Sequence, residues 1–235
     1  MSDVFLSGEK IDLCVPQEED FDQWASWFND QKITQFLEQG KYPNTPNQQK
    51  EFYQNSLEQG RFLTLVKTKD GELLDVVSLS DINLDKKTCQ VAYVCPVKSD
   101  KARIAPLEAL ALATEHAFNR FGVTQVWAGH AYPGLKGWVQ KTEILGYKTD
   151  EVTPTGFRHG MTVSDAVRTS ITKKSLLALV ERRKGHSWPG EIKAKKMMTA
   201  IRGTKSLAEQ VDESVKRLNL QHDEMMSRIE LDAQI

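Results

Sequence analysis

The stretch CQVAYVCPVKSDKARIAPLEALALATEHAFNRFGVTQVWAGHA, residues 89–131, decides the fold. β-Branched and aromatic residues predict a strand over residues 89–95. Apolar residues recur at helical spacing over 104–121, where Pro106 suits the first helical turn. Residues 124–131 predict a second strand. A strand, a crossover helix and a second strand indicate a parallel unit, alone or within a mixed sheet.

The turn that enters the helix is basic. Lys98, Lys101 and Arg103 precede a helix N-terminus, whose backbone N–H groups and dipole attract anions. A basic turn read without a fold is most often simply solvated. Within this pattern, it is the predicted site of an anionic cofactor.

The order of strand, basic turn, helix, strand and short helix ends in Leu145-Gly146-Tyr147 and resembles the acetyl-CoA half of the GNAT N-acetyltransferase superfamily. That family's turn usually reads Arg/Gln-x-x-Gly-x-Gly/Ala, and this chain has Ile104 and Pro106 at the two glycine positions. The resemblance implies acetyl-CoA as co-substrate. It also implies that a set of turn residues holds the pyrophosphate: Lys101, Ala102, Arg103, Ile104 and Ala105.

An earlier segment carries a second likeness. Trp27-Phe28-Asn29-Asp30, then Ile33 and a loop with Pro43, resemble the opening of GNAT enzymes that act on ribosomal N-termini or on nucleotide-linked amino sugars. In those enzymes the helix pair and its loop form one wall of the acceptor site. The resemblance therefore implies a small-molecule amine or a nucleotide-sugar as the acceptor.

The composition narrows the possible classes of protein. The chain has 235 residues, 31 basic and 32 acidic side chains, and a net charge of −1, so no whole-protein field favours nucleic acid. The hydrophobic content of 40% supports a real core. Three cysteines without Cys-x-x-Cys spacing predict neither a disulfide framework nor a zinc site, and no metal is expected. Without a signal peptide or a long apolar run, the expectation is a cytoplasmic protein with no membrane segment.

Elsewhere, periodicity predicts strands over 10–15, 61–67 and 73–80, helices over 18–29 and 33–37, and a helix ending near residue 59. Residues 151–160 predict a loop, and 161–171 the last strand. The expected fold class is α/β with a mixed sheet, a GNAT acyl-CoA N-acyltransferase fold. The expected domains are a GNAT-like domain over 1–172 and a helical extension over 173–235.

The extension ends in a heptad-like pattern. Within residues 204–235, apolar side chains recur at steps of three and four, which indicates a short coiled-coil seam. Two readings stay open: a helix folded back onto its own domain, or a homo-oligomer formed through this segment. The seam residues are Ala208, Val211, Val215, Leu218, His222, Met225 and Ile229.

In the resembled fold the two parallel strands diverge where the helix leaves, and the acyl thioester lies in that gap. The backbone of Tyr93, Val94 and Cys95 is then expected to pair with the pantetheine arm as an added strand would. His130 and Tyr132 end the second strand. Imidazole can act as the base and a phenol as the acid, although a histidine at a strand end is more often a hydrogen-bonded edge residue.

A third catalytic candidate is Asp81, which ends a strand and could orient an amine or a sugar hydroxyl; a turn-capping aspartate is the commoner reading. Gln90 occupies the position where many relatives carry a glutamate base, and glutamine cannot accept a proton at neutral pH. His159 is a weaker candidate.

Three functions are compatible with the sequence. The leading hypothesis is an N-acetyltransferase that moves an acetyl group from acetyl-CoA to a primary amine by direct attack. The alternative is a catalytically inactive GNAT-like module that assembles through its C-terminal helices. The third is an acyl transferase acting on nucleic acid, which the near-neutral charge disfavours.

Overall fold

The structure, a computed structural model, describes residues 3–37, 40–96, 104–203, 213 and 215–226. Its centre is one mixed sheet with the strand order β1-β2-β3-β4-β5-β6-β8-β7. Every neighbouring pair is antiparallel except β5 and β6, which are parallel. The strands are β1 (Val4–Ser7), β2 (Ile11–Cys14), β3 (Phe62–Thr68), β4 (Leu73–Asn83), β5 (Thr88–Val94), β6 (Gln125–Tyr132), β7 (Lys148–His159) and β8 (Thr162–Thr172).

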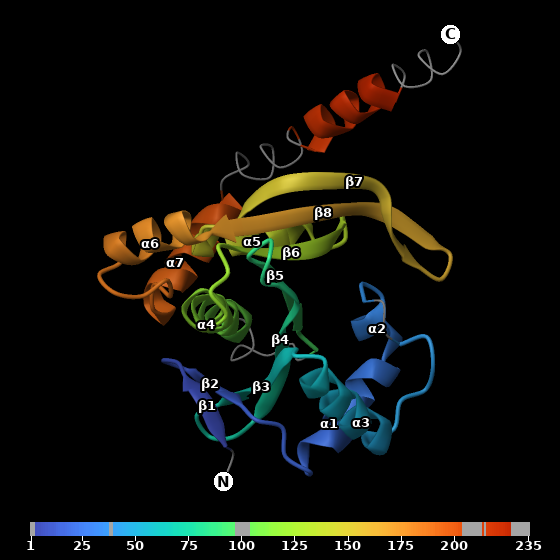
Figure 1. Cartoon of the computed structure of the whole chain (residues 1–235), viewed down its shortest axis with the longest axis vertical. Coiled ribbons are helices and arrows are strands. Elements are labelled where there is room, and N and C mark those ends of the chain that lie inside the picture. The colour runs from blue at the N-terminus through green and yellow to red at the C-terminus, as the bar shows by residue number, and fades with distance from the viewer. Residues whose placement is uncertain (1–2, 38–39, 97–103, 204–212, 214, 227–235) are drawn as a thin grey trace.

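Helices cover both faces of the sheet (Figure 1). The helices α1, α2 and α3 lie on one side, and α4 lies on the other with α6 and α7 beside it. A short 3-10 helix, η2, follows α5. The bounds are α1 (Asp20–Asn29), α2 (Gln31–Thr34), α3 (Pro46–Glu58), α4 (Ala105–Arg120), α5 (Lys136–Thr142), η2 (Glu143–Leu145), α6 (Lys173–Arg182) and α7 (Glu191–Gly203).

Two apolar clusters follow from this layering. The larger one joins α4 to the sheet, and Leu107 and Leu110 of α4 are fully buried against Val77 and Leu79 of β4. The smaller one joins α1 to the opposite face through Trp24 and Leu65. Burial of such side chains contributes about 1.5–3 kcal/mol each, which makes α4 the main support of the sheet's centre.

The parallel pair diverges soon after it forms. Pairing runs from Thr88 with Gln125 to Gln90 with Trp127 and then stops, although both strands continue. The mixed sheet and the strand-helix-strand crossover predicted from residues 89–131 are therefore confirmed, including the gap between the parallel strands.

One element was predicted wrongly. Residues 151–159 form most of strand β7, which pairs with β8 along a long hairpin, and not a loop. Pro154 and Gly156 suggested a loop, but they lie in the irregular register between Thr153 and Phe157. Because β7 is an edge strand with half-exposed faces, its polar composition hides it from hydrophobic patterning.

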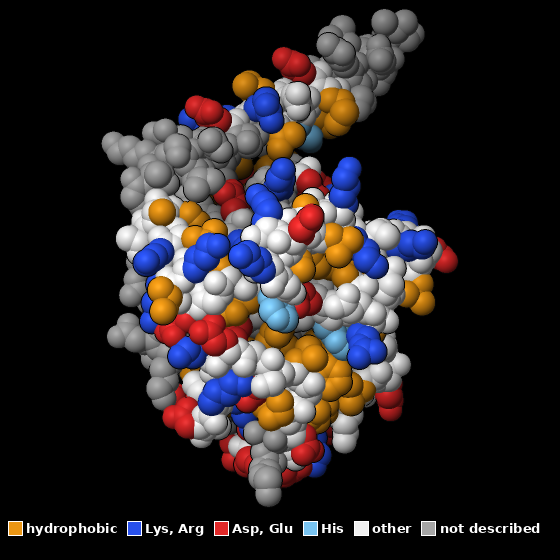
Figure 2. All heavy atoms as spheres, turned by 90° about the vertical axis from the view of Figure 1, so that its left-hand side faces the viewer, with side chains coloured by type: hydrophobic (Ala, Val, Ile, Leu, Met, Phe, Trp, Pro, Cys, Tyr) orange, Lys and Arg blue, Asp and Glu red, His pale blue; other side chains and the backbone are white. Residues whose placement is uncertain are grey.

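The first part of the C-terminal extension, α6 and α7, packs closely on the rest. Ala194 and Met198 of α7 belong to the main core, and the Trp188 indole N–H donates to Glu9 Oε2 over 3.0 Å. The domain division at residue 172 stays a prediction. Figure 2 views this side of the molecule, where acidic and basic side chains are interspersed.

The predicted seam is described in part. Val215 is buried with Val139 and Val167 of the same chain, whereas Met225 is 54% exposed. Val215 thus packs onto the domain of its own chain. Self-association through the rest stays a prediction, and Ala208, Val211 and Ile229 lie outside the described residues.

Candidate functional site

The candidate site is the gap between β5 and β6. Beyond Gln90, Tyr93 and Val94 pair with Val77 and Val76 of β4 on one side. In the described structure their other side has no pairing with β6. This backbone edge can therefore accept an extended amide-bearing ligand as an added strand would bind, which is the geometry expected for a pantetheine arm.

One wall of the gap, formed by β4 and β5, contains a buried acid. Asp75 is fully buried, and neither carboxylate oxygen has a hydrogen-bond partner of normal geometry within the described residues. Burial raises the pKa of Asp75 to about 7, and the nearby Tyr93 hydroxyl and Cys95 thiol offset part of that rise. Burial, with the Asp75 charge beside it, also raises the pKa of Tyr93 well above its usual value. This carboxyl therefore titrates near neutral pH.

The same wall carries an aromatic pair. The Tyr93 ring stacks on Trp138 of α5, with centroids 5.5 Å apart and an interplanar angle of 22°. Because α5 follows β6, the pair connects the two strands past the point where their pairing ends. A ligand that runs between the strands must pass beside this stack or part it.

The opposite wall, formed by β6 and β8, holds His130. Its side chain is buried, and Nε2 forms a 2.9 Å hydrogen bond with Thr169 Oγ1 of β8. Burial lowers the pKa of His130 to about 4. The imidazole is therefore neutral at pH 7, and so low a pKa makes it a weak base for an amine. These data describe a hydrogen-bonded core histidine.

Tyr132, at the end of β6, is buried beside Val139 and Val167. Its peptide bond to Pro133 is cis. Asp81 lies at the far end of β4, next to the paired part of β5 and away from the gap. It is exposed and adopts a positive φ of 47° at a bulge, which suits an aspartate in a turn-like position.

Among the described residues, from Ile104 onward, the helix entry offers few amide donors to a phosphate. Pro106 has no N–H, and the amides of Leu107 and Glu108 both donate to the Ile104 carbonyl. Ile104 and Ala105 are buried. The predicted phosphate contacts Lys101, Ala102 and Arg103 lie outside the described residues.

The first turn of α4 also contains a buried carboxylate. Glu108 accepts hydrogen bonds from the backbone N–H groups of Glu9 and Lys10, and so ties the β1–β2 turn to α4. Burial raises the pKa of Glu108. A side-chain carbon at Gly8 would clash with this carboxylate, so the turn requires glycine. When ionised, Glu108 repels an anion at this helix end.

The segment that follows α2 contacts the β6–β8–β7 part of the sheet at two points. The Phe36 ring lies against Gly134, so closely that a side-chain carbon there would overlap it. His159 Nδ1 donates to the Leu37 carbonyl over 2.8 Å, which links the β7 end to the same segment. The predicted weak candidate His159 thus has a structural bond.

The divergent parallel strands beside a helix entry define an α/β fold of the acyltransferase type. Residues 11–132, just over half of the chain, match the acetyltransferase (GNAT) domain family. The chain belongs to this family. None of the curated proteins compared matches it.

Solved structures agree on the fold. The spermidine N-acetyltransferase from Vibrio cholerae, in complex with CoA and spermine, has 14% identity and a TM-score of 0.63, covering 72% of this chain and 99% of that one. A GCN5-related N-acetyltransferase from Brucella melitensis has 15% identity and a TM-score of 0.62, covering 79% and 85%. At such identities the likeness shows the fold alone, so the ribosomal or amino-sugar subtype stays a prediction.

Asp75 was not predicted from the sequence as a site residue. Its signal is present, because a lone acid interrupts the apolar run Leu73-Leu-Asp-Val-Val77. An acid inside a buried strand is rare and needs an explanation.

Within the described residues, no group of three or more His, Cys, Asp or Glu side chains could hold a metal, and no helix is long and apolar enough to cross a bilayer.

Proposed function

We propose that this chain is an acyl-CoA-dependent N-acetyltransferase that acetylates a primary amine of a small or nucleotide-linked acceptor. The observation that carries the proposal is the β5 edge beyond Gln90, which has no β6 partner in the described structure. It supports a pantetheine arm lying along Tyr93 and Val94. Family membership supports the same reaction class.

Bound acetyl-CoA would supply the acetyl group as an activated thioester. The attacking amine must lose a proton as its nitrogen bonds to the acetyl carbon, and the departing thiolate must gain one. The Asp75 carboxyl, with a pKa of about 7, suits proton removal at neutral pH better than His130 with a pKa of about 4. Catalytic roles for His130, Tyr132 and Asp81 remain predictions.

Isothermal titration tests the cofactor. We expect acetyl-CoA to bind more tightly than 3′,5′-ADP, which carries the adenine ring and phosphate groups but lacks the pantetheine arm. Equal affinity would mean that the arm is not held between the strands. The absence of any heat at millimolar acetyl-CoA would remove the transferase proposal.

A second candidate function is a non-catalytic module of the same fold. The Tyr93–Trp138 stack and the Glu108 carboxylate in the first turn of α4 favour it, because both oppose a phosphate-bearing thioester at the gap. The same titration separates the two functions. Sedimentation of the chain with and without residues 204–235 then tests assembly, for which a monomer in both cases is the contrary result.

A further inference from the structure

The one exposed cysteine of the chain lies at the strand gap. Cys14 and Cys89 are buried, whereas Cys95 is exposed. Cys95 directly follows the last residue of β5, at the strand edge that has no β6 partner in the described structure. Its thiol is therefore accessible from the gap in which the proposed function places the acyl thioester.

The register of β4 and β5 places a buried acid behind this thiol. Val77 pairs with Tyr93, and Val76 pairs with Val94. One step further along the same antiparallel pair, Asp75 is opposite Cys95. Residues that are directly opposite point to the same face of the sheet, with Cβ atoms about 4.5–5.5 Å apart. In agreement, the Cys95 thiol lies close enough to the Asp75 carboxyl to favour its ionised form.

The Asp75 carboxyl has the capacity to accept a proton. It is fully buried, and neither oxygen has a hydrogen-bond partner of normal geometry within the described residues. The other group beside it is the Tyr93 phenol, which stays protonated because burial and the Asp75 charge raise its pKa. An ionised carboxylate in such a place costs free energy, so a proton from the neighbouring thiol would relieve it.

An exposed nucleophile with a base behind it is the arrangement that covalent catalysis requires. The thiolate is the reactive form of cysteine, and an adjacent proton acceptor supplies it. Asp75 does not need to touch the substrate, because it acts only on the thiol. Its complete burial is therefore compatible with this role.

We propose that Cys95 is a nucleophile that takes the acetyl group from acetyl-CoA before the amine receives it. Asp75 takes the thiol proton, Cys95 Sγ bonds to the acetyl carbonyl carbon, and the bond from that carbon to the CoA sulfur breaks. The departing CoA thiolate receives the proton from Asp75.

The second half of the reaction restores the thiol. The amine nitrogen bonds to the acetyl carbon, and the bond from that carbon to Cys95 Sγ breaks. The proton that the nitrogen loses passes through Asp75 to the Cys95 thiolate. This inference rests on the proposed function, because it requires a bound acyl-CoA.

The unmodified protein tests the acetyl-enzyme directly. It is incubated with acetyl-CoA in the absence of amines and quenched in acid, and peptide mass spectrometry locates the acetyl group. We expect one acetyl group on Cys95 and none on Cys14 or Cys89, because excess acetyl-CoA drives the exchange of one thioester for another. If acetyl-CoA binds in the titration but Cys95 stays unmodified, the inference is overturned while the proposed function stands.

The concentration of acetyl-CoA separates catalysis from chemical acetylation of a surface thiol. Transfer within a bound complex gives a loading rate that saturates, and a CoA analogue without the sulfur should compete. A loading rate that rises in proportion to acetyl-CoA, without saturation, would show an ordinary surface reaction and contradict the proposal.

The pH profile of loading tests the role of Asp75. In wild type the proton moves within the pair, so above about pH 7, where Asp75 is ionised, the thiolate population should no longer depend on pH. The loading rate at saturating acetyl-CoA should therefore level off near pH 7. In Asp75→Asn it should keep rising, roughly tenfold per pH unit, up to the ordinary thiol pKa of about 8.5.

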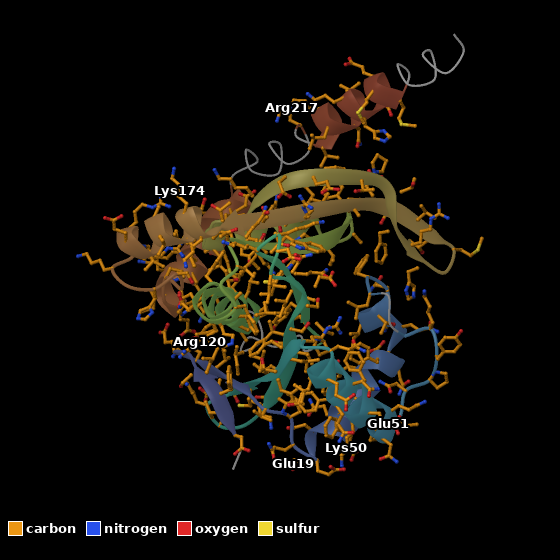
Figure 3. The ribbon with its side chains drawn as sticks, in the orientation of Figure 1. Glu19, Lys50, Glu51, Arg120, Lys174 and Arg217 are labelled. Atoms are coloured by element: carbon orange, nitrogen blue, oxygen red, sulfur yellow. The ribbon has the colours of Figure 1, made fainter. Side chains whose placement is uncertain are left out.

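A matched acid-to-amide change serves as the control. Glu51→Gln alters an exposed position of α3 and should keep the wild-type profile (Figure 3). If the profile of Asp75→Asn has the same shape as that of wild type, Asp75 does not act on Cys95.

Cys95→Ser tests whether the acetyl-enzyme lies on the path to product. We expect acetyl-CoA affinity to be kept and turnover with primary amines to fall at least tenfold. Unchanged turnover would overturn the proposal. Thermal unfolding of each variant reports whether it folds. Should Asp75→Asn fail to fold, the acetyl-enzyme of the unmodified chain and the exposed Cys95→Ser substitution still decide the proposal.

Discussion

Burial shifts the pKa values of the titratable groups in the two walls of the strand gap in opposite directions. On the β4–β5 wall, loss of hydration raises the pKa of Asp75 to about 7; on the β6–β8 wall, it lowers the pKa of His130 to about 4. In both cases burial favours the neutral form. The difference teaches that the capacity to accept a proton at neutral pH lies with the acid, although histidine is the side chain that usually titrates there.

The largest expected effect is on stability. The folded-state pKa of Asp75 lies above its unfolded value of about 3.8, so its stabilising effect is complete below pH 3.8 and is lost as the pH rises to about 7. The shift corresponds to about 4 kcal/mol. We expect the unfolding free energy of wild type to fall by about that amount relative to Asp75→Asn between pH 4 and 7. Urea unfolding measures this free energy for both proteins. If the pH profiles of wild type and Asp75→Asn are parallel, Asp75 is not buried as described.

The contribution of His130 to stability should change with pH in the opposite direction. Its folded-state pKa lies below the unfolded value of 6.5, so its contribution is present above pH 6.5 and is lost as the pH falls to about 4. Relative to His130→Gln, wild type should lose about 3 kcal/mol over that window. The two slopes nearly cancel in wild type, so only the single variants reveal them. A flat difference profile would break the comparison.

The next largest expected effect is on turnover, which should differ between variants of the two walls. If Asp75 takes the proton, Asp75→Asn should lower turnover about a hundredfold, within the range typical of general bases. His130→Gln should lower it less than tenfold. The assay is release of free CoA thiol in the presence of a panel of primary amines, with acetyl-CoA affinity measured in parallel. A larger loss for His130→Gln than for Asp75→Asn would return the role of base to the β6–β8 wall.

The smallest expected effect concerns the stack that joins the walls. An aromatic pair contributes about 0.5–1.5 kcal/mol beyond its buried area. If the Tyr93–Trp138 stack must part for the arm, Trp138→Ala should tighten acetyl-CoA binding by up to about tenfold. Trp138→Phe keeps a ring and serves as the control. Weaker binding in Trp138→Ala would instead show that the indole contacts the cofactor.

Much of the fold could be predicted because its signals are local. The helical spacing over 104–121 predicted α4, and the β-rich run over 89–95 predicted β5. The polar edge strand β7 could not be predicted in this way, because its pairing with β8 comes from a partner in the hairpin and not from its own pattern. The short strand β1, Val4–Ser7, was also not predicted.

The sequence alone determined the strand-helix-strand crossover and most of the helices and strands, since periodicity and turn residues act over a few neighbours. The position of the strand gap was implied by the resemblance to the GNAT fold. The tertiary structure decided the chemistry of the site. Asp75 and His130 carry their pKa shifts because segments distant in sequence remove water from them. Desolvation and partner geometry depend on the whole packed chain, which no local pattern encodes.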